Sequence, residues 1–177
     1  ESSTPLNIII FNSIQLENVL GVRQLAYFNA TKSNYHCFMN FDDFRGHVYL
    51  IDDDPSICRS LAFTLSSSQY SVQTFDGPRA FLKDSLPISP AVILLDMRMP
   101  EMSGTELQSS LLKSGRETPI VFISGESQPA EIIEAMKQGA IDFLLKPFGM
   151  ESLMKAIENG LHKDRARQND LIRDMDI

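Results

Sequence analysis

The sequence contains no tryptophan, only three histidines and only two cysteines, Cys37 and Cys58, among 177 residues. Two thiols are too few for a disulfide framework and their spacing matches no metal site, so a reducing, cytoplasmic setting is expected. No stretch reaches the roughly 18 consecutive apolar residues that a membrane-spanning helix needs. The opening segment ESSTPLNIIIFNS lacks the basic region of a signal peptide.

Positive charge is also scarce. Lysine and arginine total 16 against 23 aspartates and glutamates, which gives a net charge of −7. Because nucleic-acid phosphates are bound by Lys and Arg, this balance argues against a nucleic-acid-binding surface in this chain. Hydrophobic residues make up 43% of the sequence, which is enough for a packed core and argues against wholesale disorder.

Residues 1–46 differ from the rest of the chain and contain no site motif. LNIIIF has the composition of a strand, and SIQLENVLGVRQLAYF has apolar residues at loosely helical spacing. We interpret this segment as an N-terminal extension of unknown role that packs on the next domain or is partly disordered. The alternatives are a small sensor or partner-binding element, or translated upstream sequence outside the working protein.

From His47 onward, short apolar runs alternate with amphipathic segments. Five strands are predicted at HVYLID, SVQTF, AVILLD, PIVFIS and IDFLL. The helices between and after them begin at Asp54-Pro55, Gly77-Pro78, Ser103, Pro129 and about Met150. In the helix that ends at Lys113, three leucines are expected to point inward, Leu107, Leu111 and Leu112. This alternation predicts an α/β domain, a doubly wound parallel sheet with helices on both faces.

Polar side chains gather where these predicted strands end. The first strand ends in Asp52-Asp53-Asp54, the third in Asp96, the fourth in Ser124-Gly125 and the fifth in Lys146-Pro147. Taken singly, such an Asp is usually a cap and such a Lys is usually solvated. Because sites in parallel sheets lie beyond the carboxyl ends of the strands, the set together predicts one pocket.

Three carboxylates in one pocket repel one another and need compensating positive charge. Lys146 supplies one charge, and Mg²⁺, which prefers oxygen ligands, would supply two more. The absence of neighbouring His or Cys argues against zinc. A carboxylate beside a cation, a hydroxyl and an ammonium group is suited to attack on phosphorus. An Asp can be the nucleophile, and the product is then an acyl phosphate on that Asp.

The motifs LIDDD, LLDMRMPEMSG, PIVFISG and EAMKQGAIDFLLKPF, with the following AIENGL, resemble the receiver domain of two-component response regulators. They cover about residues 47–161, and DMRMPEMSG and AIDFLLKPF resemble the LuxR-type, FixJ-like branch in particular. The resemblance implies a flavodoxin-like (βα)5 fold with strand order 2-1-3-4-5 in a receiver domain at 47–162. It also implies a signalling domain that catalyses only its own phosphotransfer and dephosphorylation.

The resemblance assigns the metal site residue by residue. Asp96 would be the phosphoacceptor and a ligand of Mg²⁺. Asp53 would bind the ion directly and Asp52 through water, and the backbone carbonyl of Arg98 would be a further ligand.

The resemblance also implies a switch. Ser124 would hydrogen-bond the new phosphoryl group, and Lys146, joined to Pro147 by a cis peptide, would pair with Asp96 and then with the phosphate. Phe143 would turn inward when Ser124 moves. The face formed by the helix at 129–138, the strand IDFLL and the last helix would then change shape and form a homodimer.

Arg98 and Glu126 lie two residues beyond Asp96 and Ser124, and we expect them to flank the mouth of the pocket. One interpretation is that they pair across it and hinder attacking water, which lengthens the lifetime of the phosphoryl group. The alternative is that both are simply solvated.

The expected partners are a histidine kinase and a second phosphorylated copy of the chain. No membrane binding is expected, and DNA would be bound only through a C-terminal domain. Residues 163–177 are interpreted as a charged helical linker toward that domain, either in a truncated chain or in a stand-alone receiver. A phosphorylation-independent interaction module is the alternative. A haloacid-dehalogenase-type phosphatase is disfavoured, because Arg98 stands where its general acid would be.

Overall fold

The computed structural model describes residues 44–84 and 89–175, which belong to one compact unit, Asp42–Ile177. The strand and the helix that the sequence suggests within residues 1–43 lie outside the described residues. Within the described ranges no helix is both long and apolar enough to cross a membrane.

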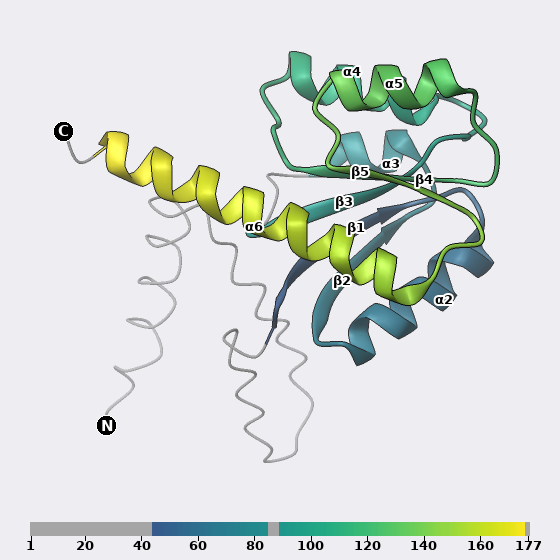
Figure 1. Cartoon of the computed structure of the whole chain (residues 1–177), viewed down its shortest axis with the longest axis horizontal. Coiled ribbons are helices and arrows are strands. Elements are labelled where there is room, and N and C mark those ends of the chain that lie inside the picture. The colour runs from purple at the N-terminus through teal and green to yellow at the C-terminus, as the bar shows by residue number, and fades with distance from the viewer. Residues whose placement is uncertain (1–43, 85–88, 176–177) are drawn as a thin grey trace, which may run out of the picture. The chain divides into compact units, whose positions relative to one another are not determined.

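A parallel five-stranded sheet forms the centre of the unit (Figure 1). Its strands are β1 (Gly46–Ile51), β2 (Tyr70–Phe75), β3 (Ala91–Asp96), β4 (Ile120–Ser124) and β5 (Asp142–Leu145). Their spatial order is β2-β1-β3-β4-β5, with every neighbouring pair parallel. The predicted flavodoxin-like architecture and strand order are confirmed.

In the part of the chain that the structure describes, five helices cover the two faces of the sheet: α2 (Pro55–Ser67), α3 (Pro78–Lys83), α4 (Gly104–Lys113), α5 (Pro129–Lys137) and α6 (Met150–Met175). Helices α2 and α6 lie on one face and α3, α4 and α5 on the other (Figure 1). Strand residues alternate between two separate cores. Val48 and Leu50 contribute to the α2–α6 core, whereas Tyr49 and Ile51 contribute to the opposite one.

The helix starts follow from local chemistry. The Asp54 side chain accepts from the backbone N–H groups of Ser56 and Ile57 at the start of α2. Ser103 and Glu106 form a capping box at the start of α4. These caps place each helix directly after the strand-end loop that carries candidate site residues.

One inward-facing leucine was predicted wrongly. Leu107 and Leu111 are buried, but the side chain of Leu112 is 46% exposed. Positions i and i+4 share a helix face, whereas the next residue is rotated by about 100°, so Leu112 leaves the stripe that faces the sheet.

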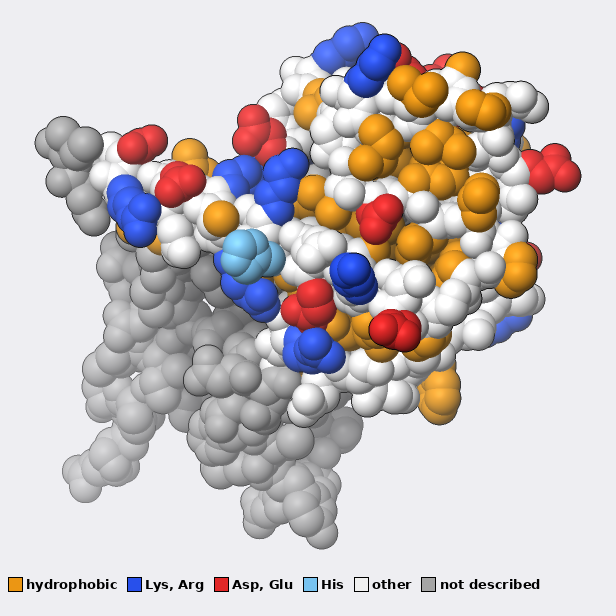
Figure 2. All heavy atoms as spheres, viewed as in Figure 1, with side chains coloured by type: hydrophobic (Ala, Val, Ile, Leu, Met, Phe, Trp, Pro, Cys, Tyr) orange, Lys and Arg blue, Asp and Glu red, His pale blue; other side chains and the backbone are white. Residues whose placement is uncertain are grey.

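Exposed apolar side chains gather beside β5. They are Ile133 and Met136 on α5, Leu145 at the end of β5 and Met150 at the start of α6. Figure 2 shows hydrophobic side chains clustered over this part of the surface. We call these four residues the α5–β5–α6 patch.

Candidate functional site

Two buried carboxylates stand at the carboxyl ends of the central strands. Ile51 is paired with Leu95, so the next residues along β1 and β3, Asp52 and Asp96, leave the sheet side by side. Asp52 is 2% exposed and Asp96 is 6% exposed. The aliphatic strand before Asp96 is buried along its whole length, which holds this carboxylate on a rigid support.

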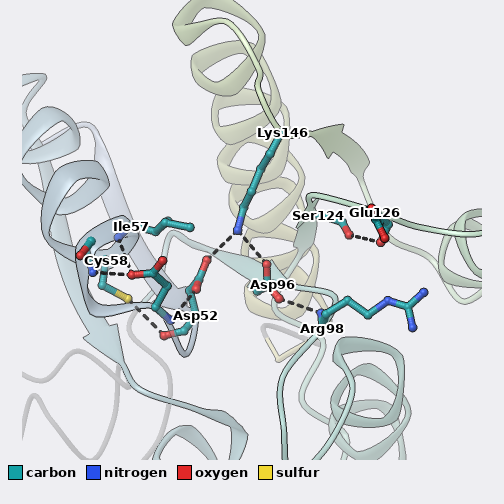
Figure 3. Close-up of polar contacts among 10 residues, drawn as sticks. Asp52, Ile57, Cys58, Asp96, Arg98, Ser124, Glu126 and Lys146 are labelled. Atoms are coloured by element: carbon teal, nitrogen blue, oxygen red, sulfur yellow. Dashed lines mark hydrogen bonds and ion pairs between the residues drawn. The ribbon is translucent and has the colours of Figure 1, made fainter.

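Lys146 bridges these carboxylates (Figure 3). Its Nζ lies 3.0 Å from Asp52 Oδ2 and 2.9 Å from Asp96 Oδ1. Lys146 directly follows β5, and its backbone N–H donates to the Ser124 carbonyl at 2.7 Å. The Lys146–Pro147 peptide is cis. The structure therefore brings together three of the residues that the sequence places at strand ends.

One ammonium group shared by two buried carboxylates leaves the cluster short of positive charge. Burial raises the pKa of Asp96, the hydrogen bond and charge of Lys146 and the Arg98 backbone N–H oppose this rise, and Asp52 adds to it. Burial of Lys146 disfavours its ammonium form, but the hydrogen bonds and charges of Asp96 and Asp52 outweigh burial and raise the Lys146 pKa. The site favours an additional cation.

Backbone N–H groups orient the other oxygen of each carboxylate. Asp52 Oδ1 accepts from the N–H of Asp54 at 2.8 Å, and Asp96 Oδ2 accepts from the N–H of Arg98 at 2.7 Å. The loop after Asp96 then turns back closely, because Gly104 N–H donates to the Met97 carbonyl. A Cβ at Gly104 would lie 2.6 Å from the Asp96 carbonyl oxygen, so this turn requires glycine.

The donor set fits a hard divalent cation. Asp52 and Asp96 offer oxygen only, and Asp53 beside them is exposed. Among the described residues no three His, Cys, Asp or Glu side chains form a ready metal cage. Mg²⁺ does not require one, since it keeps several waters and uses one or two carboxylates. The nearby Cys58 thiol donates to the Asp52 carbonyl at 3.3 Å, and burial raises its pKa, so it remains a protonated packing group.

Ser124 lies on the strand next to Asp96, and Phe143 lies on β5, on the far side of β4. Asp96 is paired with Ile123, so Ser124 is the next residue of the neighbouring strand, and its side chain is fully buried. Its hydroxyl donates to the Glu126 carbonyl at 2.7 Å (Figure 3). Phe143 is half-buried and stacks on Phe122 with ring centroids 6.1 Å apart.

The expected pairing of Arg98 with Glu126 is not what the structure has. The Arg98 guanidinium lies 2.9 Å from Glu131 Oε2 instead, and Glu126 reaches Ser124 through its backbone carbonyl. Glu131 is anchored in the first turn of α5, where the same oxygen accepts from Gln128 N–H at 2.8 Å. The sequence shows Glu131 as a capping residue three positions after Gln128, but nothing in it indicates the partner of Arg98.

The class of protein follows from the parallel (βα)5 fold and from two acids at the carboxyl ends of its central strands, which Lys146 bridges. The model of the response regulator receiver domain family matches residues 48–158, and the chain belongs to this family. Receiver domains in general bind Mg²⁺ at this acidic pocket and are signalling domains rather than enzymes in the usual sense.

The particular relatives are FixJ- and TodT-type response regulators. The chain is 38% identical over 122 residues to the response regulator protein TmoT of Ectopseudomonas mendocina, covering 69% of this chain and 56% of that protein. It is 39% identical over 120 residues to the transcriptional regulatory protein FixJ of Bradyrhizobium diazoefficiens, covering 67% of this chain and 58% of that protein. The chain thus spans about half the length of the curated relatives it matches.

Solved structures agree with the fold. The response regulator StyR superposes with a TM-score of 0.68 at 41% identity, covering 73% of this chain and 66% of that one. The FixJ-N structure superposes with a TM-score of 0.62 at 34% identity, covering 66% of this chain and 93% of that one.

Proposed function

We propose that this receiver domain takes a phosphoryl group from the phosphohistidine of a histidine kinase onto Asp96. The observation that carries the proposal is the bridge from Lys146 to Asp52 and Asp96 at the buried ends of β1 and β3. This arrangement presents one carboxylate oxygen as a nucleophile beside a fixed cation.

In the proposed step, an Asp96 oxygen attacks phosphorus and forms an O–P bond. The P–N bond of the phosphohistidine breaks, and the imidazole nitrogen keeps the electron pair and then takes a proton. Lys146 neutralises charge on the phosphoryl oxygens. Mg²⁺ supplies further charge neutralisation when bound; Asp53, Asp96, Asp52 through water and the Arg98 carbonyl would hold it.

The proposed output is a shift of population. The phosphoryl group adds acceptor oxygens close to Ser124, and movement of Ser124 leaves space that Phe143 fills. This change would reshape the α5–β5–α6 patch, where apolar side chains are already exposed, and support a homodimer (Figure 2). By analogy with the longer relatives, one of which is named as a transcriptional regulatory protein, α6 would lead to a DNA-binding output domain.

The test uses the whole chain with acetyl phosphate and Mg²⁺, read by intact mass. The expected result is a gain of one phosphoryl group in the wild type. No gain is expected in Asp96→Asn, and none in wild type that is incubated with the phosphodonor in the presence of EDTA. No gain in the wild type would instead favour an interaction module that acts without phosphorylation. Size-exclusion chromatography with and without beryllofluoride then tests the dimer, and an unchanged elution volume would contradict it.

A further inference from the structure

Ser124 at the end of β4 and Ser127 in the loop after it form a short hydrogen-bond chain. Ser127 Oγ donates to Ser124 Oγ at 2.9 Å, and Ser124 Oγ donates to the Glu126 carbonyl at 2.7 Å. A hydroxyl has a single proton to donate. The proton of Ser124 is therefore committed to the loop and is not available to an acceptor on Asp96.

We propose that Ser127 is a positioning residue. It holds the Ser124 hydroxyl in the orientation that donates to the Glu126 carbonyl, called here the committed state, and so opposes the phosphorylated state. The inference rests on the proposed function of Asp96. Ser127 acts through Ser124 and has no direct role in the transfer.

The bond from Ser127 differs between the two states of Ser124. While Ser124 donates to Glu126, its oxygen accepts from Ser127, and each bond in such a chain polarises the next. Switching moves the Ser124 side chain toward a phosphoryl oxygen, and this displacement of Oγ away from the loop breaks both the bond to Glu126 and the bond from Ser127. Because the Ser127 bond stabilises only the committed state, its removal shifts the population toward the switched state.

The environment strengthens this hold. Ser124 is fully buried, so water does not readily replace a lost partner at its hydroxyl. The backbone there is also constrained, because the Ser124 carbonyl accepts from Lys146 N–H. The side-chain orientation of Ser124 therefore depends on the loop residues that bond to it.

The experiment measures beryllofluoride affinity by calorimetry in excess Mg²⁺ on the whole chain. Beryllofluoride adds to a carboxylate oxygen as a mimic of the phosphoryl group. Ser127→Ala is expected to bind it about fivefold more tightly than the wild type, the factor that corresponds to one neutral hydrogen bond. Ser127→Thr, which keeps the hydroxyl, is expected to stay close to the wild type.

Two comparisons separate positioning from general loosening of the structure. Ser110→Ala, which removes a hydroxyl bonded to Glu106 within α4, is the matched control and should leave the affinity unchanged. In a Ser124→Ala background, Ser127→Ala should have no effect, because its route of action is gone.

The outcomes also separate this inference from the proposed function. If the wild type binds beryllofluoride but Ser127→Ala binds it equally or more weakly, the inference is wrong and the phosphoacceptor proposal stands. An equal gain with and without Ser124 would likewise overturn it. If the wild type does not bind beryllofluoride at all, the proposed function fails and the inference fails with it.

Discussion

Lys146 Nζ lies 2.9 Å from Asp96 Oδ1, and the same ammonium group reaches Asp52 at 3.0 Å. One cation thus compensates two carboxylates that the sheet buries at the ends of adjacent strands. Removing it should leave two uncompensated buried charges.

We therefore expect Lys146→Met to lower the free energy of unfolding at pH 7 by about 2 kcal/mol, below the cost of breaking a fully buried pair because Lys146 is partly exposed. Burial raises the folded pKa of Asp96, and removal of the opposing ammonium group raises it further, so the loss should grow as pH rises and vanish in acid. Urea titrations across pH measure this. Lys146→Met in an Asp96→Asn background should cost less, and an equal cost would contradict the shared bridge.

Asp96→Asn should leave the protein at least as stable as the wild type at pH 7 without Mg²⁺. Burial raises the folded pKa of Asp96, so its ionisation above an unfolded pKa of about 4 works against folding. Any gain in stability should disappear below about pH 4, where the carboxyl is protonated in both states. Denaturant unfolding checks this, with exposed Asp53→Asn as the control. A clear loss of stability at pH 7 would show that Asp96 stabilises the apo fold.

His47 should make the fold sensitive to acid. Its side chain is 6% exposed, and burial lowers its pKa to about 4, with Asp84 opposing the shift. Between the unfolded pKa of about 6.5 and pH 4 only the unfolded state takes up the proton, so stability should fall by up to about 3 kcal/mol as pH drops through this window. His47→Phe should flatten this part of the stability curve. Exposed His162→Phe is the control, and identical curves for His47→Phe and wild type would exclude His47 as the cause.

Arg98 and Glu131 should be coupled weakly, and Arg98 and Glu126 should not be coupled. The Arg98 side chain is 57% exposed, and exposed pairs contribute about 0.5 kcal/mol. Double-mutant cycles with Arg98→Ala, Glu131→Ala and Glu126→Ala measure both couplings in the unphosphorylated protein. Coupling only to Glu126 would show that the original expectation holds in solution.

Asp164 should be a stabilising anchor for α6. Its carboxylate is 1% exposed and accepts from Ala91 N–H at 2.9 Å and from Ser89 Oγ at 2.6 Å. Asp164→Ala leaves these buried donors unpaired, so we expect a loss of about 2–3 kcal/mol in the free energy of unfolding. Asp170→Ala on the exposed part of the same helix is the control, and losses of similar size would contradict the anchor.

The sequence by itself determined the helices and strands and the residues that stand where the strands end. Alternating apolar runs are properties of neighbouring residues, so strands such as AVILLD and caps such as Asp54 could be predicted locally. Because sites in parallel sheets lie beyond the carboxyl ends of the strands, the sequence alone indicated Asp52, Asp96, Ser124 and Lys146 as site candidates. The structure places all four at the same edge of the sheet.

Only the tertiary structure decided which partners these residues have. Arg98 contacts Glu131 rather than Glu126, and Asp164, within the segment interpreted as a linker, is buried against the start of β3. The bond from Ser127 to Ser124 is likewise invisible in the sequence. Such contacts depend on where loops and helices from distant parts of the chain meet in space. Periodicity along the chain shows which face of an element is buried, but not which distant residues it meets.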